Sequence, residues 1–211
     1  MDKPKQVVQR LLEVAGTTYA AEARITISDK PMPLFQLLVL CMLASKPIDA
    51  AIATSAAREL FKAGLRTPKA VLASDRRTMI DAFGRAHYVR YDESSATRLT
   101  DMAEHVRDDY SGDLRELADR SQHDVAAVKR MLKKFKGIGD TGADIYLREV
   151  QDVWTWVQPY FDDRATAAAK QLGLPTSPAK LGALARGNNA RLAAALVRAS
   201  LDDDVRRRVT G

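Results

Sequence analysis

The stretch from Lys133 to Leu147, KKFKGIGDTGADIYL, contains the residues best placed to bind an anion. Gly137 and Gly139 flank Ile138 between an apolar helical segment and a second helix, and this order predicts a helix–hairpin–helix. Glycine tolerates positive φ, and because it has no Cβ it lets another backbone come close. The free N–H groups in the first turn of the second helix, together with the helix dipole, would form an anion site.

Three lysines, Lys133, Lys134 and Lys136, lie beside this turn. A phosphate of nucleic acid is the natural ligand of a glycine turn with lysines next to it. The alternative is an ordinary corner between two helices, in which glycine only ends the first helix. A single G-x-G before a helix does not decide between the two interpretations.

A second candidate for chemistry is the acidic pair Asp162 and Asp163, which begins a helix that ends in LGLP. The dipole of a helix favours an anion at its N-terminus. Such an anion could stabilise positive charge on a sugar or activate a water molecule, as in glycoside hydrolysis. From the residues alone, an N-cap is the more common role of an aspartate at this position.

The hydrophobic pattern predicts an all-α fold of about a dozen mostly short helices around these residues. The segment from Leu34 to Ser45 is apolar nearly all round, as expected of a buried central helix. Thr67 and Asp124 are predicted to be N-caps of short helices. Residues 23–28, ARITIS, could form a short strand, but no second segment alternates well enough to pair with it. The C-terminal RRRVTG is expected to fray.

The composition restricts the class of protein. The chain has 211 residues, 46% of them hydrophobic, which suits one large domain or two small ones. Its net charge of +6 permits a polyanionic partner without proving one. The single cysteine, Cys41, is expected in the core, and it excludes an iron–sulfur cluster or a cysteine-rich zinc site made within the chain.

The same cysteine count excludes a disulfide framework, so we expect a reducing cytoplasm. The N-terminal residues are too polar for a signal peptide, and the longest apolar run, Pro33 to Ala44, is too short to span a membrane. The three histidines show no metal-ligand spacing, so no catalytic metal is expected.

From about Leu34 to Pro175 the chain resembles the helix–hairpin–helix/Gly-Pro-Asp superfamily of base-excision DNA glycosylases, the endonuclease III-like proteins. The resemblance rests on order: a buried apolar helix ending in ASKPID, several short helices, then FKGIGDTGAD, then FDDRATAAAKQLGLP. The last segment is similar to the family's catalytic segment, VDTHxxRVxxRLGL. Alignment of the two LGL ends without a gap places the family's aspartate at Asp162. Asp163 would then be the cap, or the catalyst if the register shifts by one.

The resemblance implies two helical lobes with a DNA cleft between them. Residues 34–150 would form the lobe that ends in the hairpin, and residues 1–33 with 151–211 would form the lobe that carries catalytic Asp162. The partner would be double-stranded DNA with a damaged or mismatched base, bound by a nucleoid-associated, cytoplasmic monomer. The residues implied in DNA binding belong to the hairpin and to the end of the buried helix: Lys136, Gly137, Ile138, Gly139, Thr141 and Lys46.

Lys46 would fill the gap that a flipped-out base leaves in the duplex. An equally good interpretation of Lys46 is a solvated lysine in a loop. The hairpin carbonyl groups could hold a structural monovalent cation, K⁺ or Na⁺, and the resemblance implies no other cofactor.

Several positions depart from the family pattern. Thr141 stands where bifunctional members have the lysine that forms a Schiff base, and a hydroxyl cannot form an imine. Lys136 replaces the usual proline, Arg164 replaces a histidine, and the four-cysteine cluster loop of many members is missing. The sequence therefore favours a monofunctional DNA glycosylase. Two alternatives stay open: a non-catalytic DNA-binding protein, and a glycosylase with lyase activity that uses a displaced lysine such as Lys136 or Lys170.

Overall fold

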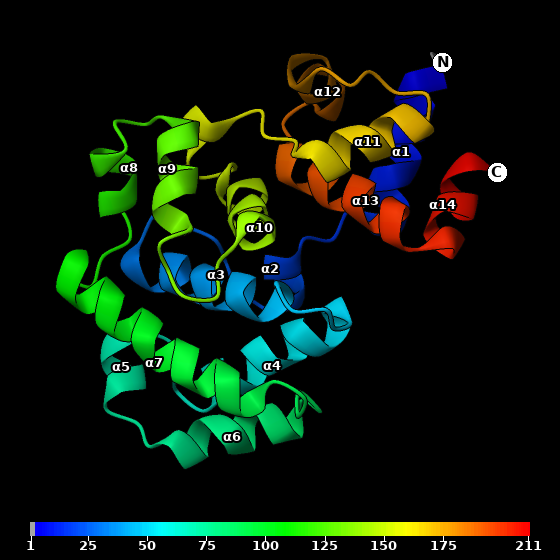
Figure 1. The fold of residues 1–211 in the computed structure, drawn as a ribbon. Coiled ribbons are helices and arrows are strands. Elements are labelled where there is room, and N and C mark those ends of the chain that lie inside the picture. Colours follow the sequence, from blue (N-terminus) through cyan, green and yellow to red (C-terminus); the bar gives the residue numbers. More distant parts are fainter. Residues whose placement is uncertain (1–2) are drawn as a thin grey trace. The chain divides into compact units, whose positions relative to one another are not determined.

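The computed structural model describes residues 3–211, and within that range the fold is all-α, as the sequence predicts (Figure 1). Residues 23–28 follow a short helix as non-helical chain and pair with no strand, so the possible strand there was wrong. No helix in residues 3–211 combines the length and the apolar character that crossing a bilayer requires.

The helices are α1 (Lys3–Ala15), α2 (Tyr19–Glu22), α3 (Pro31–Ala44), α4 (Ala50–Lys62), α5 (Pro68–Leu72), α6 (Arg76–Arg85), α7 (Asp92–Asp109), α8 (Glu116–Arg120), α9 (Val125–Leu132), α10 (Asp140–Val150), α11 (Asp163–Gln171), α12 (Pro178–Ala185), α13 (Asn189–Leu201) and α14 (Asp203–Thr210), with a 3₁₀ turn at Thr155–Val157.

The helices group into two compact units. The middle unit comprises residues 19–146, and the terminal unit comprises residues 3–18 together with 147–211. The sequence predicts lobe boundaries at residues 34 and 150, whereas the units change after Thr18 and after Tyr146. Helix α10 therefore begins in the middle unit and ends in the terminal unit.

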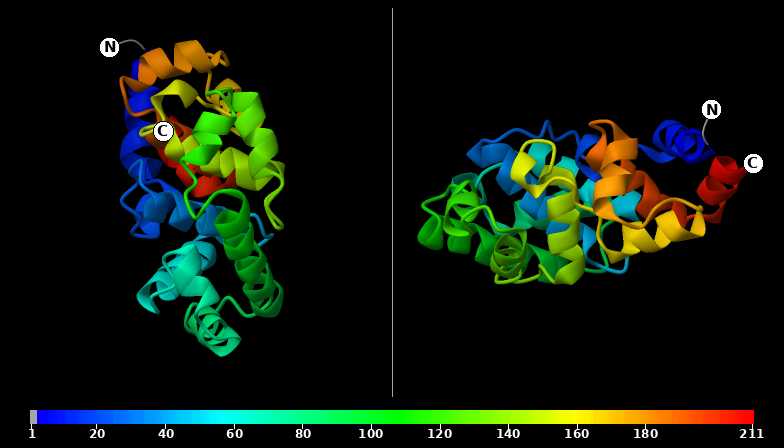
Figure 2. Two further views of the ribbon diagram at one scale, coloured as in Figure 1. Left: turned by 90° about the vertical axis from the view of Figure 1, so that its left-hand side faces the viewer. Right: turned by 90° about the horizontal axis from the view of Figure 1, so that it is seen from above.

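Helix α3 is the core of the middle unit. Every residue from Pro33 to Leu43 is buried, because the helix is apolar on all sides and other elements cover it all round. Helices α2, α4 and α7 all contact α3, and α6 and α5 pack in turn on α4 and α7 (Figures 1 and 2). Cys41 is fully buried here, which confirms its prediction as a core residue.

The terminal unit is organised around α13, which contacts α1, α11, α12 and α14 (Figure 2). Its core consists of aliphatic and alanine side chains from these helices, with Phe161 as an aromatic member. The expected fraying of the last residues was wrong. They form α14, because Asp202 accepts hydrogen bonds from the N–H groups of Asp204 and Val205, and because Val209 is completely buried in the core.

Short polar caps explain where many of the helices start. Thr67 and Asp124 accept hydrogen bonds from backbone N–H groups three residues ahead, as predicted, and Asp75 does the same for α6. Such bonds satisfy N–H groups that have no partner inside the helix.

Candidate nucleic-acid interface and aspartate site

The predicted hairpin connects α9 to α10 through residues 133–139, within the middle unit. Gly137 has φ +91°, a conformation that side chains with a Cβ rarely adopt, so glycine is required at this position. Ile138 is buried and anchors the turn, whereas Gly139 and Thr141 are exposed. Within residues 3–211 the N–H groups of Gly139 and Thr141 make no hydrogen bond, so they are free to meet an anion.

The glycines also allow close packing under the turn. A Cβ on Gly137 would lie 3.0 Å from Cδ of Arg98 and 3.1 Å from Cγ of Met42. A Cβ on Gly142 would lie 2.5 Å from Oγ of Ser45, whose hydroxyl donates to the Cys41 carbonyl at 2.6 Å. Gly142 therefore lets the first turn of α10 approach the end of α3, next to the loop that carries Lys46.

We expect three alanine substitutions to separate packing from ligand approach. Gly137→Ala should lower the free energy of unfolding by about 1–2 kcal/mol through backbone strain, and Gly142→Ala by about 1–3 kcal/mol through overpacking. Gly139 has open space around its Cβ position and no positive φ, so Gly139→Ala should change stability by less than about 0.5 kcal/mol. Its methyl group should nevertheless weaken duplex DNA binding about tenfold, because it obstructs a phosphate at the free N–H groups.

Urea denaturation measures the free energy of unfolding of each variant, and fluorescence anisotropy with a DNA duplex measures its DNA affinity. Gly84→Ala is the matched control, since Gly84 lies in α6 with nothing near its Cβ position. It should leave DNA affinity unchanged. Equal DNA affinity of Gly139→Ala and Gly84→Ala would show that no phosphate approaches the turn.

The positive charge of the hairpin is largely paired within the protein. Lys136 Nζ lies 3.1 Å from Oδ2 of Asp101 on α7, and Lys133 Nζ donates to Oδ1 of Asp140 at 2.7 Å. The hydrogen bond from Lys133 lowers the pKa of Asp140, so this carboxylate is anionic at neutral pH. Of the three hairpin lysines, only Lys134 is without an ion pair among the residues described.

Neutralising these two carboxylates should tighten binding to any polyanion. We expect Asp101→Asn and Asp140→Asn each to increase DNA affinity up to about fivefold at low salt, because an exposed ion pair is worth about 1 kcal/mol or less. The gain should shrink as salt is added. Asp81→Asn, which releases Arg77 on α6, changes the net charge equally and serves as the control. An equal gain in that variant would mean that only net charge matters.

Lys46 lies in the loop after α3, and its Nζ is 5.6 Å from the centre of the Tyr91 ring. The guanidinium of Arg90 lies 5.3 Å from the same ring, and the adjacent Val89 is 62% exposed. Lys46 is thus half-buried against an aromatic face rather than fully solvated. The sequence did not single out Arg90, because only the fold brings the loop before α7 next to the end of α3.

Asp162 is the N-cap of α11, and its Oδ1 accepts from the N–H of Ala165 at 2.8 Å. Its other oxygen, Oδ2, pairs with Nη1 of Arg148 from the end of α10, and both side chains are only 6% exposed. Asp163, the expected cap if Asp162 is the catalyst, is exposed in the first turn and does not cap the helix, so that assignment was wrong. Asp162 therefore has a capping and a charge-pairing role at once.

Gln151, one turn after Arg148, positions the chain that leads to Asp162. Its fully buried amide donates to the carbonyls of Arg148 and Tyr160 and accepts from the N–H of Tyr160 at 2.9 Å. The sequence analysis missed both residues. The available signal was limited to their spacing, because Gln151 follows the end of α10 directly, three positions after Arg148.

Aromatic side chains can stack on a flipped-out base, and those considered for this role are divided between the two units. Tyr88 is fully buried and shares a hydrogen bond with Ser95 at 3.1 Å, which makes it a core residue. Trp154 is buried and stacks on the half-buried Trp156, with ring centres 5.5 Å apart. Tyr91 is the candidate that combines partial exposure with neighbouring cations.

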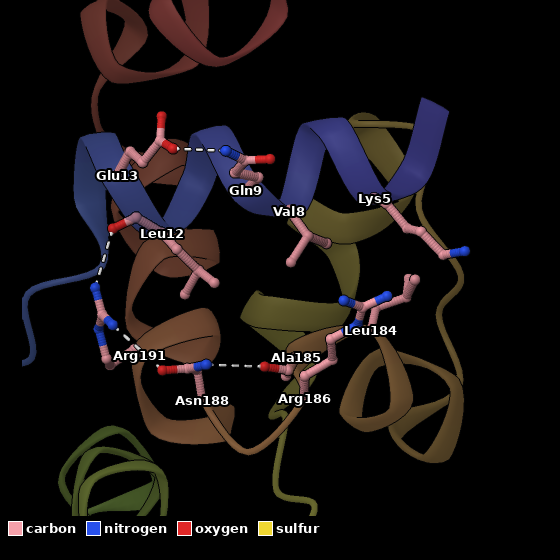
Figure 3. Close-up of a pocket in the computed structure, with 10 residues that line it drawn as sticks. All are labelled: Lys5, Val8, Gln9, Leu12, Glu13, Leu184, Ala185, Arg186, Asn188 and Arg191. Atoms are coloured by element: carbon pink, nitrogen blue, oxygen red, sulfur yellow. Dashed lines mark hydrogen bonds between the residues drawn. The ribbon is translucent and has the colours of Figure 1, made fainter. Parts of the chain in front are cut away.

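A cavity of about 630 Å³ lies inside the terminal unit, between α1 and the α12–α13 turn (Figure 3). Val8, Leu12 and Leu184 contribute apolar surface, and Arg191 donates to the carbonyl of Gly16 at 3.1 Å beside it. Asp162 does not line this cavity, and neither does Arg148. The cavity is therefore separate from the aspartate site.

Comparisons with known proteins give a limited result. No protein-family model matches the chain, and no curated protein matches it. Among solved structures, a trapped endonuclease III–DNA covalent intermediate in an estranged-adenine complex is similar, with a TM-score of 0.48 and 16% identity over 92% of this chain and 84% of that chain. The residues of the hairpin and of the segment around Asp162 are what a functional assignment depends on.

Proposed function

We propose that this protein is a DNA glycosylase of base-excision repair, which hydrolyses the N-glycosidic bond of a damaged or mismatched base. The observation that carries the proposal is the hairpin: an exposed turn with Gly137 at φ +91° and with N–H groups that have no partner in residues 3–211. Its order in the chain, before an aspartate-capped helix that is followed by LGLP, is the order of the resembling family.

In this proposal the hairpin holds one DNA strand. The amides of Gly137 and Gly139 face a phosphate, and Thr141 adds a hydroxyl in the first turn of α10. The N–H of Ile138, expected to join them, already donates to the carbonyl of Phe135 at 3.0 Å. Lys136 breaks its ion pair with Asp101 and binds a phosphate oxygen instead. Lys46, supported by Tyr91 and flanked by Arg90, enters the space that the flipped base leaves.

Asp162 supplies the chemistry. Its carboxylate stabilises the oxocarbenium-like charge that builds up on the deoxyribose as the bond to the base breaks, and water then adds to the sugar carbon. Arg148 opposes this while it is paired, because its charge neutralises the carboxylate. The active state therefore needs Arg148 to turn towards another acceptor, for which a DNA phosphate has the right geometry.

The monovalent cation implied by the resemblance fits the hairpin's donor set. Within residues 3–211 the carbonyl oxygens of Lys136, Gly137 and Ile138 accept no hydrogen bond, and neutral oxygens of this kind suit K⁺ or Na⁺. These carbonyls would hold the ion, and the ion would stiffen the turn. Thr141 in place of a lysine makes the enzyme monofunctional. Borohydride treatment with abasic DNA should then trap no covalent adduct.

One observation favours a second candidate, a DNA-binding protein without catalysis. The carboxylate of Asp162 is buried, paired with Arg148 and occupied as a cap, and these three features describe a structural residue. In a DNA-binding protein of this kind, the hairpin binds DNA as described above, and the Arg148–Asp162 ion pair only joins α10 to α11.

A panel of duplexes with different lesions tests the two candidates. Each duplex carries one damaged or mismatched base and a strand label, and alkali cleaves the strand wherever a base has been removed. The glycosylase proposal expects excision of one class of base and full-length product from undamaged DNA. Binding to every duplex with no excision would favour the second candidate. Absence of binding to any duplex would contradict both.

A further inference from the structure

A second cavity, of about 780 Å³, lies within the middle unit where the end of α2, the start of α3 and the end of α4 meet. Positive side chains dominate its walls, with Glu59 as the carboxylate among them. We call it the basic pocket. Its cations are Arg24, Arg58, Lys62 and Arg66.

The charges in the basic pocket do not balance. Glu59 is bound mainly by Arg85, which lies outside the pocket with its Nε 2.7 Å from Oε2, and this hydrogen bond lowers the pKa of Glu59. Lys62 is 3.9 Å from the other oxygen. The remaining three cations, Arg24, Arg58 and Arg66, form no ion pair with a carboxylate within residues 3–211, and Arg58 has only a weaker, longer-range attraction to Glu59. The pocket therefore has a positive potential that an anion would satisfy.

Two of these arginines are held in place by backbone carbonyls. Arg58 Nη1 donates to the carbonyl of Glu22 at 3.2 Å, and Arg66 Nε donates to the carbonyl of Phe61 at 2.7 Å. A guanidinium has five N–H donors, so each arginine keeps several for a ligand. Fixed guanidinium groups bind phosphate in a bidentate manner with little further loss of freedom.

Gln36 adds a second, independent observation. It is one of the few buried polar residues of the chain, 9% exposed, and it lines the basic pocket from the second turn of α3. Its side-chain amide makes no hydrogen bond within residues 3–211, so its N–H groups and its oxygen are available to a ligand in the pocket. Met32, Pro33 and Phe61 provide apolar wall beside it. The pocket thus offers cations, an amide and an apolar face together.

We infer that the basic pocket binds a nucleoside phosphate, either a free nucleotide or the 5′-phosphate end of a DNA strand. The phosphate pairs with the arginines, the amide of Gln36 hydrogen-bonds the base or sugar, and the apolar wall covers the flat side of the base. A bare phosphate would contact only the arginines, and an apolar molecule would contact only the apolar wall.

This site is separate from the proposed DNA interface. Gln36 and Lys46 lie ten positions apart, about 15 Å along the axis of α3 and its continuation. The hairpin packs at the Lys46 end, through Gly142 and Ser45. Nucleotide binding in the basic pocket therefore does not depend on base excision, and a separate experiment tests it.

Calorimetric titration of the full chain with a nucleoside 5′-monophosphate tests the inference. The double variant Arg24→Gln/Lys62→Gln removes two exposed cations of the pocket, and we expect affinity to fall about tenfold or more. Lys69→Gln/Arg77→Gln makes the same change of charge at exposed cations outside the pocket and should stay within about twofold of the wild type. Gln36→Leu should also weaken binding, because it removes the amide that hydrogen-bonds the ligand, and its Tm shows whether the variant is folded.

Two outcomes overturn the inference: no binding of nucleotide to the wild type, or equal weakening by the pocket variant and the control. Oligonucleotides with a 5′-phosphate or a 5′-hydroxyl distinguish the two sources of the ligand. A preference for the phosphorylated strand that disappears in the pocket variant identifies a strand end. Equal binding of both strands, with nucleotide binding still dependent on the pocket, identifies a free nucleotide.

Discussion

Replacing Arg148 with methionine is expected to lower the free energy of unfolding of the terminal unit by about 3–5 kcal/mol. The substitution keeps a long, flexible side chain but leaves the carboxylate of Asp162 buried without its partner. A buried, unpaired charge costs far more than the lost contact itself, because its hydration is not replaced. Both tryptophans of the chain, Trp154 and Trp156, lie in the terminal unit, so tryptophan fluorescence during urea denaturation reports on this unit.

The double variant Arg148→Met/Asp162→Asn provides the control. It removes both charges, and asparagine caps a helix about as well as aspartate, so most of the lost stability should return. At the exposed Arg77–Asp81 pair of α6, Arg77→Met should cost less than about 0.5 kcal/mol. A loss below about 1 kcal/mol in Arg148→Met would show that Asp162 reaches water or another partner in solution.

Asp162→Asn is expected to reduce the single-turnover rate of base excision by about a hundredfold or more, while binding of the same duplex stays within about twofold. The amide keeps the cap on α11 and the size of the side chain, but it removes the negative charge that stabilises the transition state. Rapid-quench measurement of excision, beside anisotropy measurement of binding, separates the two effects.

The neighbouring acid gives a matched control for this prediction. Asp163→Asn makes the same chemical change one residue later, at an exposed position that caps nothing, and should retain full activity. Because Asp162→Asn also leaves Arg148 unpaired, each assay needs a temperature at which circular dichroism shows the variant folded. If Asp163→Asn abolishes excision and Asp162→Asn does not, the catalyst is Asp163. If neither substitution affects excision, no carboxylate of this pair takes part.

Local signals in the sequence located most helices, and the reason is the short range of the interactions. A cap such as Thr67 or Asp124 bonds an N–H group three residues ahead, so a few neighbouring residues contain the whole signal. The apolar character of α3 likewise predicted its burial. The hairpin was predictable for the same reason, since Gly137, Ile138 and Gly139 are consecutive.

The sequence-based predictions failed where contacts between residues distant in the sequence determine the local structure. The last residues were expected to fray, but Val209 gains enough from burial in a core made by other helices to order α14. With Asp162 as the catalyst, Asp163 was expected to be the cap, but the buried guanidinium of Arg148 binds Asp162 and holds it as the cap at the start of α11. Neither effect can be seen in a window of ten residues.

The sequence by itself determined that the protein is helical, that a glycine turn joins α9 to α10, and that an acid begins α11. Only the tertiary structure decided what these groups are bound to. Lys136 meets Asp101 across 35 positions, Arg148 meets Asp162 across 14, and Gly142 lies against Ser45. Backbone preferences and caps act between neighbours in the chain. Pairing of charges and close packing depend instead on distance in space, and only the folded chain sets that distance.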